Sequence, residues 1–160
     1  MNAVRRYAGI GLAAAFLLAA CTPNGVGVST SSGGGGGGQT VTIDVNLTLN
    51  LPVQTPYGQS GGMKPPVTTV HVGDSIVFNN SDGFAHTATA IPGATKFPAG
   101  SPFDQGATTQ SGSTLSGGWS SGAMQAGSSS QTVKADKAGT YLFGCYFHYG
   151  APMRGAIVVQ

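Results

Sequence analysis

Short runs in which apolar and polar residues alternate constrain the fold of this chain more than any other feature. Residues 41–51 (VTIDVNLTLNL) place an apolar side chain at every second position, which is typical of a strand that buries one face. Residues 67–72 (VTTVHV) and 75–80 (SIVFNN) predict two further strands around a Gly73-Asp74 turn. Because no segment after the N-terminal region has the period of an amphipathic helix, we expect one all-β domain over residues 41–160.

Two more strands are predicted near the C-terminus, at residues 139–145 (GTYLFGC) and 155–160 (GAIVVQ). In the first of these strands, Phe143 and Cys145 share one face because side chains alternate across a strand. Glycine and proline in the connection between the two strands favour a tight, shaped loop. We therefore expect a short loop that begins at Cys145.

Four side chains that bind soft metals accompany this loop. Cys145, His148 and Met153 lie within nine residues, and His86 lies upstream in FAHTATAI, which we interpret as a strand. Copper in electron-transfer sites takes a trigonal plane of two imidazoles and one thiolate, with a weak axial thioether. Each residue alone has a plainer interpretation as a packing or surface residue. The four together predict one copper ion that cycles between Cu(I) and Cu(II).

The same segments resemble the cupredoxins, most closely the plastocyanin and pseudoazurin type. The matching pieces are VHVGDSIVFNN, GFAH, GTYLFGC and RGAIVV, with the His and Met ligands three and eight residues after the Cys. The resemblance covers residues 67–160, with residues 41–51 as a first strand. It implies a Greek-key β-sandwich of about eight strands. It also implies a type 1 copper site formed by His86, Cys145, His148 and Met153, with a weak axial contact from the Ala85 carbonyl.

Three residues near the expected ligands depart from the family pattern. Tyr146 and Phe147 follow the Cys, where Ser or Thr and then Pro are frequent, and Thr87 follows the first His, where Asn is frequent. Residues that contact metal ligands orient them and tune the metal. We therefore expect these positions to affect the reduction potential and the spectrum of the site.

An apolar surface around His148 is the expected route for electrons. The resemblance implies that one edge of the His148 ring reaches solvent, where its neighbours in sequence are Phe147, Tyr149, Ala151 and Pro152. Two of the seven Lys and Arg residues precede Cys21, which leaves five to balance five acidic residues. This balance provides neither a basic face for nucleic acid nor a large acidic patch for steering a partner.

The N-terminus has the pattern of an export signal. Residues 1–20 combine a short basic segment with an apolar run of thirteen residues, too short for an ordinary membrane span. The run ends in LAAC, which resembles a bacterial lipobox and implies cleavage before Cys21 and lipid attachment to it. A plain secretory signal is the alternative. The resemblance to bacterial lipoproteins further implies that Thr22, rather than Asp, after the cysteine favours the outer membrane over the inner one.

Residues 21–40 are rich in Gly and Ser and include six consecutive glycines, which predicts a flexible tether to the membrane. The alternative is a segment that only separates the domain from the N-terminus and has no further function. With Cys21 assigned to lipid and Cys145 to the metal, we expect no disulfide.

The ligand pattern argues against an enzyme. A multicopper oxidase needs His on both sides of the Cys, where Gly144 and Tyr146 stand, and a dinuclear copper site needs a second ligand Cys. We therefore expect a periplasmic, lipid-anchored carrier that shuttles single electrons between redox proteins at the membrane or in the periplasm. The alternatives are a copper-storage or copper-delivery lipoprotein with the same ligands, and a structural β domain that binds metal incidentally.

Overall fold

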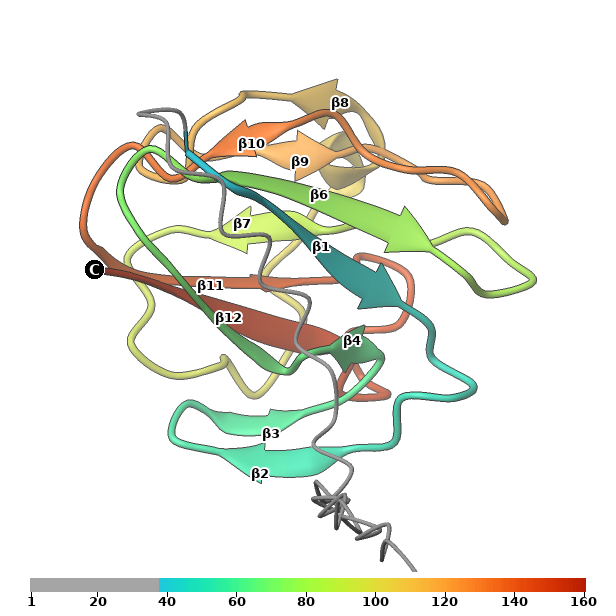
Figure 1. The fold of residues 1–160 in the computed structure, drawn as a ribbon. Coiled ribbons are helices and arrows are strands. Elements are labelled where there is room, and N and C mark those ends of the chain that lie inside the picture. Colours follow the sequence, from blue (N-terminus) through green and yellow to red (C-terminus); the bar gives the residue numbers. More distant parts are fainter. Residues whose placement is uncertain (1–37) are drawn as a thin grey trace, which may run out of the picture. The chain divides into compact units, whose positions relative to one another are not determined.

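The computed structural model describes residues 38–160, so the predicted signal peptide, Cys21 and most of the predicted tether lie outside the described residues. Within this range the chain forms two packed sheets and a separate hairpin (Figure 1). The first sheet has the order β10 (Val133–Lys134), β6 (Ser75–Asn80), β1 (Thr40–Val45), β4 (Met63–Lys64). The second has the order β5 (Val67–Val70), β12 (Arg154–Val159), β11 (Gly139–Gly144), β7 (Thr89–Ile91), β9 (Ser120–Ser121), β8 (Gln110–Ser111). The hairpin pairs β2 (Val53–Thr55) with β3 (Gly58–Ser60).

The helical content of residues 38–160 is a single 3-10 turn, η1 (Gln105–Thr108), which Asp104 caps by accepting a hydrogen bond from the Gly106 N–H. Among these residues, none belongs to a helix with the length and apolar character needed to cross a membrane. The prediction of an all-β sandwich is confirmed.

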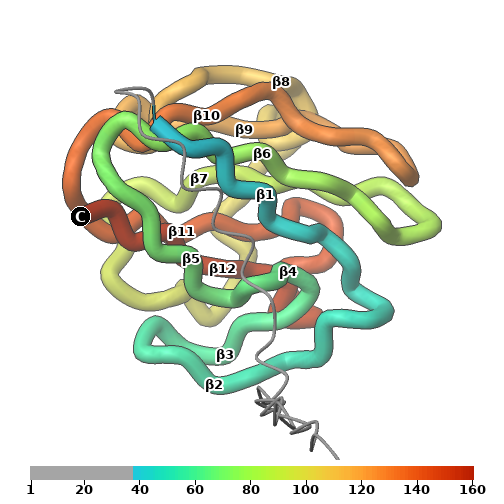
Figure 2. The backbone as a smooth tube through the Cα atoms, viewed as in Figure 1, coloured from blue at the N-terminus to red at the C-terminus, as the bar shows by residue number. Residues whose placement is uncertain are grey.

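The main core lies between the two sheets. Ile43 of β1 and Phe78 of β6 face Phe143 of β11 and Ile157 of β12, and all four are at most 1% exposed. β1 and β6 run parallel as neighbours in one layer, and β11 and β12 pair antiparallel in the other (Figures 1 and 2). The alternation in the sequence therefore predicts the inward faces of these strands correctly.

The second sheet is buried on its outer face as well. Leu142 and Tyr149 form a smaller cluster there, against which Tyr57, Phe97 and Phe103 pack. Covering both faces of a sheet explains why consecutive residues of β11 are apolar and buried rather than alternating with polar ones.

The predicted strand over residues 41–51 is correct only as far as Val45, where β1 ends. The Asn46 side chain accepts a hydrogen bond from the Leu49 N–H at 2.8 Å, and the Asn46 carbonyl accepts one from Asn50 at 3.1 Å. These local bonds turn the chain away from the sheet, as Asn commonly does. Leu49 and Leu51, which the alternation places on the buried face, are each 74% exposed, so this part of the prediction is wrong.

The Gly- and Ser-rich stretch over residues 101–130 packs onto the sandwich. Trp119 is 4% exposed and stacks on Phe78 with ring centroids 4.8 Å apart. Further along, Met124 is buried and exchanges two backbone hydrogen bonds with His86. This stretch therefore fixes the backbone of a predicted ligand.

Candidate metal centre

The loop between β11 and β12 is closed at its base by hydrogen bonds. Cys145 directly follows β11 and Met153 directly precedes β12, and the Cys145 N–H donates to the Met153 carbonyl at 2.9 Å. Inside the loop, the N–H groups of Ala151 and Met153 donate to the His148 carbonyl at 2.9 and 3.3 Å. The register of the two strands therefore brings the first and last predicted ligands side by side.

Met153 is fully buried and packs against the backbone at Gly62. A side chain at position 62 would lie 2.5 Å from Met153 Cγ, so only glycine leaves room for the thioether arm in its present position. The loop backbone is also tied to this neighbour, because the Gly61 N–H donates to the Pro152 carbonyl at 2.8 Å.

His86 comes from the segment between β6 and β7. Its N–H donates to the Met124 carbonyl at 3.1 Å, and its carbonyl accepts from the Met124 N–H at 2.8 Å. The Asn80 side chain donates to the carbonyls of Met124 and Phe84, both at 2.9 Å. His86 thus lies just before β7 rather than inside a regular strand, and both neighbouring segments hold its backbone.

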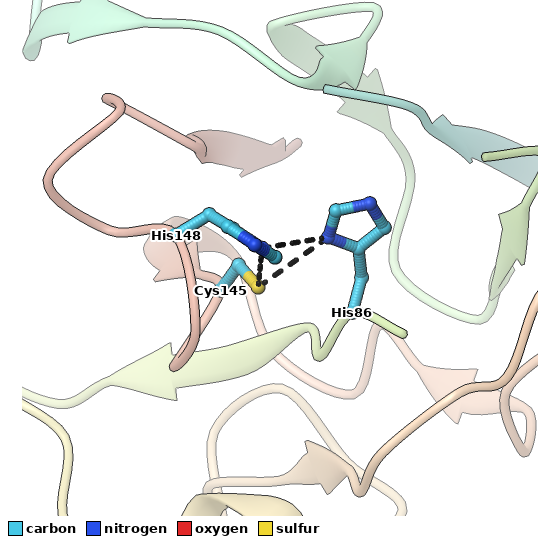
Figure 3. A group of neighbouring side chains, drawn as sticks. All are labelled: His86, Cys145 and His148. Carbon is cyan, nitrogen blue, oxygen red and sulfur yellow. Dashed lines mark hydrogen bonds between the residues drawn. The ribbon is translucent and has the colours of Figure 1, made fainter. Parts of the chain in front are cut away.

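Three of the predicted ligands converge on one point (Figure 3). The Nδ1 atoms of His86 and His148 lie 3.1 Å apart, and each lies 3.7 Å from the Cys145 Sγ. His86 and Cys145 are fully buried, and His148 is half-buried. Donors that share one ion through bonds of roughly 2.0–2.3 Å lie about 3–4 Å apart. The two imidazole nitrogens and the sulfur therefore fit a single metal ion, and this donor set is the one that copper takes in a trigonal plane.

Burial sets the protonation of these ligands. Burial lowers the pKa of His86 and of His148 below the ordinary value, so both rings are neutral near pH 7 and can offer a lone pair. Burial raises the pKa of the Cys145 thiol, although the N–H of Thr87, at 3.4 Å from Sγ, acts in the opposite direction. A metal ion must therefore displace the thiol proton when it binds.

Asp82 contacts a predicted ligand, and no motif in the sequence indicated this contact. Its Oδ2 atom lies 3.1 Å from the His86 Nε2, on the side of the ring opposite the sulfur, and its side chain is 5% exposed. The available signal was an acidic residue four positions before a ligand, which is too common to identify a contact without the fold. His71, by contrast, directly follows β5, has a side chain that is 79% exposed and takes no part in the cluster.

The surface around His148 is apolar, but its composition differs from the prediction. Phe147 is 45% exposed, Ala151 is exposed and Pro152 is half-buried. Tyr149 is 2% exposed and turns inward, where its hydroxyl donates to the Pro98 carbonyl at 3.1 Å, so its assignment to the surface is wrong. Phe84, which was not predicted, is 44% exposed and lies 5.3 Å from the His148 ring, measured between centroids.

Comparison with known proteins places this geometry in a family. A family model described as copper binding proteins, plastocyanin/azurin family, matches residues 55–160. The chain is 34% identical over 111 residues to plastocyanin from Ginkgo biloba, an alignment that covers 68% of this chain and 100% of that protein. It is 30% identical over 101 residues to chloroplastic plastocyanin from Tetradesmus obliquus, across 61% of this chain and 57% of that protein. The chain therefore spans less than two thirds of the algal relative.

Among solved structures, a purple cupredoxin from Nitrosopumilus maritimus superposes with a TM-score of 0.47 at 17% identity, over 74% of this chain and 98% of that one. The family model covers more than half of the chain and includes all four predicted ligands. With its ligand loop closed between β11 and β12 and its upstream histidine held before β7, this chain belongs to the plastocyanin/azurin family of copper-binding proteins.

Proposed function

We propose that the protein is a membrane-tethered blue copper electron carrier of the bacterial periplasm. The family supports the part of this proposal that concerns copper: the protein is a blue copper electron carrier, not an enzyme. It has one type 1 copper, bound by His86, Cys145, His148 and Met153. The observation that carries it is the approach of two imidazole nitrogens and one sulfur to within 3.1–3.7 Å of one another. Bound copper supplies a couple that gains and loses one electron.

The protein residues keep this site rigid. The backbones of His86 and Cys145 are each held by hydrogen bonds, and both side chains are fully buried. The Thr87 hydroxyl accepts a hydrogen bond from the Tyr146 N–H at 2.8 Å, which joins the two ligand segments directly. Because these contacts leave the ligands little freedom, they rearrange little when an electron arrives, and the barrier to transfer is low.

We propose that a redox partner docks on the apolar surface formed by Phe84, Phe147, Ala151 and Pro152 around His148. The support is that His148 is the least buried of the three converging ligands and that exposed aromatic rings flank it. Apolar contact suits a carrier whose charges nearly balance, since no strong field steers its approach. The carbonyl of Ala85, next to His86, would offer the copper ion a further weak contact.

The proposed attachment to the membrane rests on the sequence alone. Residues 1–20 have the pattern of a lipoprotein signal, Cys21 is the proposed site of lipid attachment, and residues 21–40, with their Gly- and Ser-rich sequence, are the proposed tether. Export and a lipid anchor would place the domain in the periplasm, at the outer membrane, where it would meet redox proteins of the membrane or of the periplasm.

Copper loading of the full chain tests the electron-carrier function. We expect one copper per chain, an intense visible band from charge transfer between thiolate and Cu(II), and fast electron self-exchange. The Cys145→Ala variant should lose the band, while a His71→Ala variant should keep it because His71 lies outside the cluster. A band that survives Cys145→Ala would refute the ligand assignment. Rapid loss of copper to a chelator together with slow self-exchange would favour copper storage or delivery.

Fractionation of bacteria that express the full chain tests the tether. The wild-type protein should be found in the outer-membrane fraction, and the Cys21→Ser variant should be found as a soluble or uncleaved form that still binds copper. A wild-type protein found only in the soluble periplasm would contradict the tether without affecting the copper assignment.

A further inference from the structure

Asp82 is a buried carboxylate in direct contact with a copper ligand. Its side chain is 5% exposed, that of His86 is 0% exposed, and the Asp82 Oδ2 to His86 Nε2 distance is 3.1 Å. A buried carboxylate with too few hydrogen bonds would be costly, so its surroundings decide whether it stays charged.

Four further donors surround Asp82. Oδ2 accepts from the backbone N–H groups of Leu47 at 2.8 Å and Thr48 at 3.3 Å, and Oδ1 accepts from the Thr48 hydroxyl at 3.1 Å and the Gly83 N–H at 2.9 Å. Together with the ring nitrogen of His86, these donors leave both carboxylate oxygens accepting hydrogen bonds. Asp82 is therefore an ionised, acceptor-only group at neutral pH.

An acceptor-only partner determines which nitrogen of His86 carries the proton. Neutral imidazole has one N–H and one lone pair, and a hydrogen bond to a carboxylate requires the N–H on Nε2. The lone pair is then on Nδ1, the atom that faces the Cys145 Sγ at 3.7 Å. The carboxylate thus selects the tautomer of His86 that can bind a metal and fixes the orientation of its ring.

We propose that Asp82 is a positioning residue of the copper site: it holds His86 in the binding tautomer, and its negative charge favours Cu(II) over Cu(I), which lowers the reduction potential. The inference rests on the proposed copper binding and extends it to a residue that the ligand motif does not contain. Carboxylates that accept from a ligating histidine raise its basicity, and their loss typically weakens metal binding by roughly 10–100-fold.

The Asp82→Asn variant of the full chain tests this role, because it removes the charge and keeps the shape. We expect its Cu(II) affinity to fall about tenfold or more, with a smaller effect on Cu(I) affinity. A tenfold change in the ratio of the two affinities corresponds to a rise of about 59 mV in the one-electron reduction potential. A potential equal to that of the wild type would overturn the proposal.

Two control variants separate the effect on copper from an effect on folding. Thr48→Val removes one hydrogen bond to Asp82 and leaves the carboxylate beside His86. Asp74→Asn alters a second buried carboxylate, which accepts from the N–H groups of Gln39 and His71 near the opposite end of β6. Both variants should lower stability, and Asp74→Asn should leave the reduction potential equal to that of the wild type. A rise in Asp74→Asn equal to that in Asp82→Asn would show a nonspecific effect and overturn the proposal.

The tautomer of His86 can be measured without any variant. In the copper-free wild-type chain at neutral pH, long-range 15N–1H correlation spectra should show the proton of His86 on Nε2, and a proton on Nδ1 would overturn the proposal. If the wild type binds no copper, the proposed function fails, and this measurement still decides the role of Asp82. If the wild type is blue and Asp82→Asn keeps its potential, only the role of Asp82 fails.

Discussion

Thr87 links the two ligand-bearing segments through its backbone and its side chain. Its N–H donates to the Cys145 Sγ at 3.4 Å, and its hydroxyl accepts from the Tyr146 N–H at 2.8 Å. The sequence marks this position only as a departure from the Asn that is frequent in the family. The structure gives the physical reason that Thr is acceptable, since a short side chain with an acceptor oxygen is sufficient to satisfy the N–H of residue 146.

Replacing Thr87 by Val should destabilise the protein by about 1–3 kcal/mol, because the Tyr146 N–H then loses its acceptor in a partly buried position. Urea unfolding of the copper-free protein measures this change. The Thr87→Ser variant, which retains the hydroxyl, should lose less than half as much. A Thr87→Val variant as stable as the wild type would mean that this hydrogen bond contributes nothing measurable.

The ligands could be predicted from the sequence because the loop is local: Cys145, His148 and Met153 lie within nine residues of one another. Asp82 could not, because the N–H groups that make its burial tolerable belong to Leu47 and Thr48, 35 and 34 positions away. The misassignment of Tyr149 has a similar cause, since its inward orientation depends on the Pro98 carbonyl, 51 positions upstream.

At the scale of elements, the excursion between β1 and β4 supports the ligand loop. The residues between Asn46 and Gly62 leave the first sheet, form the β2–β3 hairpin and return beside the loop, where Arg154 donates to the Gly61 carbonyl at 3.1 Å. The alternation in residues 41–51 predicts one continuous strand. This prediction fails after Val45 because a local pattern cannot include the effect of a contact with a distant part of the chain. The strands β5, β6, β11 and β12 were predicted correctly because their burial and their local pattern agree.

The Gly62→Ala variant should displace Met153, since the new Cβ would lie 2.5 Å from Met153 Cγ and 3.2 Å from its Cε. We expect a changed visible spectrum of the copper-loaded protein. The free energy of unfolding should fall by roughly 1–3 kcal/mol from overpacking, in addition to about 1–2 kcal/mol of backbone strain.

Gly93→Ala is the matched control, because φ is 70° there and 67° at Gly62, and no atom lies within 4 Å of the new Cβ. The control should show the strain alone and an unchanged spectrum. A spectrum that shifts equally in both variants would contradict the role of Gly62.

At the scale of the whole molecule, the site lies where the two sheets are joined. His86 is on the connection from β6 in the first sheet to β7 in the second, and the ligand loop joins two strands of the second sheet. One imidazole, one thiol and one carboxylate are therefore buried together beside a second, half-buried imidazole. Burial disfavours the charged form of each of these groups unless a partner compensates for it. Folding of the copper-free protein is consequently coupled to protonation at these four groups.

This coupling predicts a maximum of stability near pH 7–8 for the copper-free protein. Burial lowers the pKa of His86 and His148, so below about pH 6.5 the unfolded chain binds more protons than the folded one, and stability falls from pH 7 to 5. Asp82, with its pKa lowered to about 2, adds a further loss between roughly pH 4 and 2. Burial raises the pKa of Cys145, so stability also falls above about pH 8.5.

Urea midpoints followed by the fluorescence of Trp119 measure the profile. The His148→Gln variant should reduce the slope between pH 7 and 5. A flat profile from pH 7 to 5 would mean that the buried imidazoles are protonated as easily in the folded protein as in the unfolded chain.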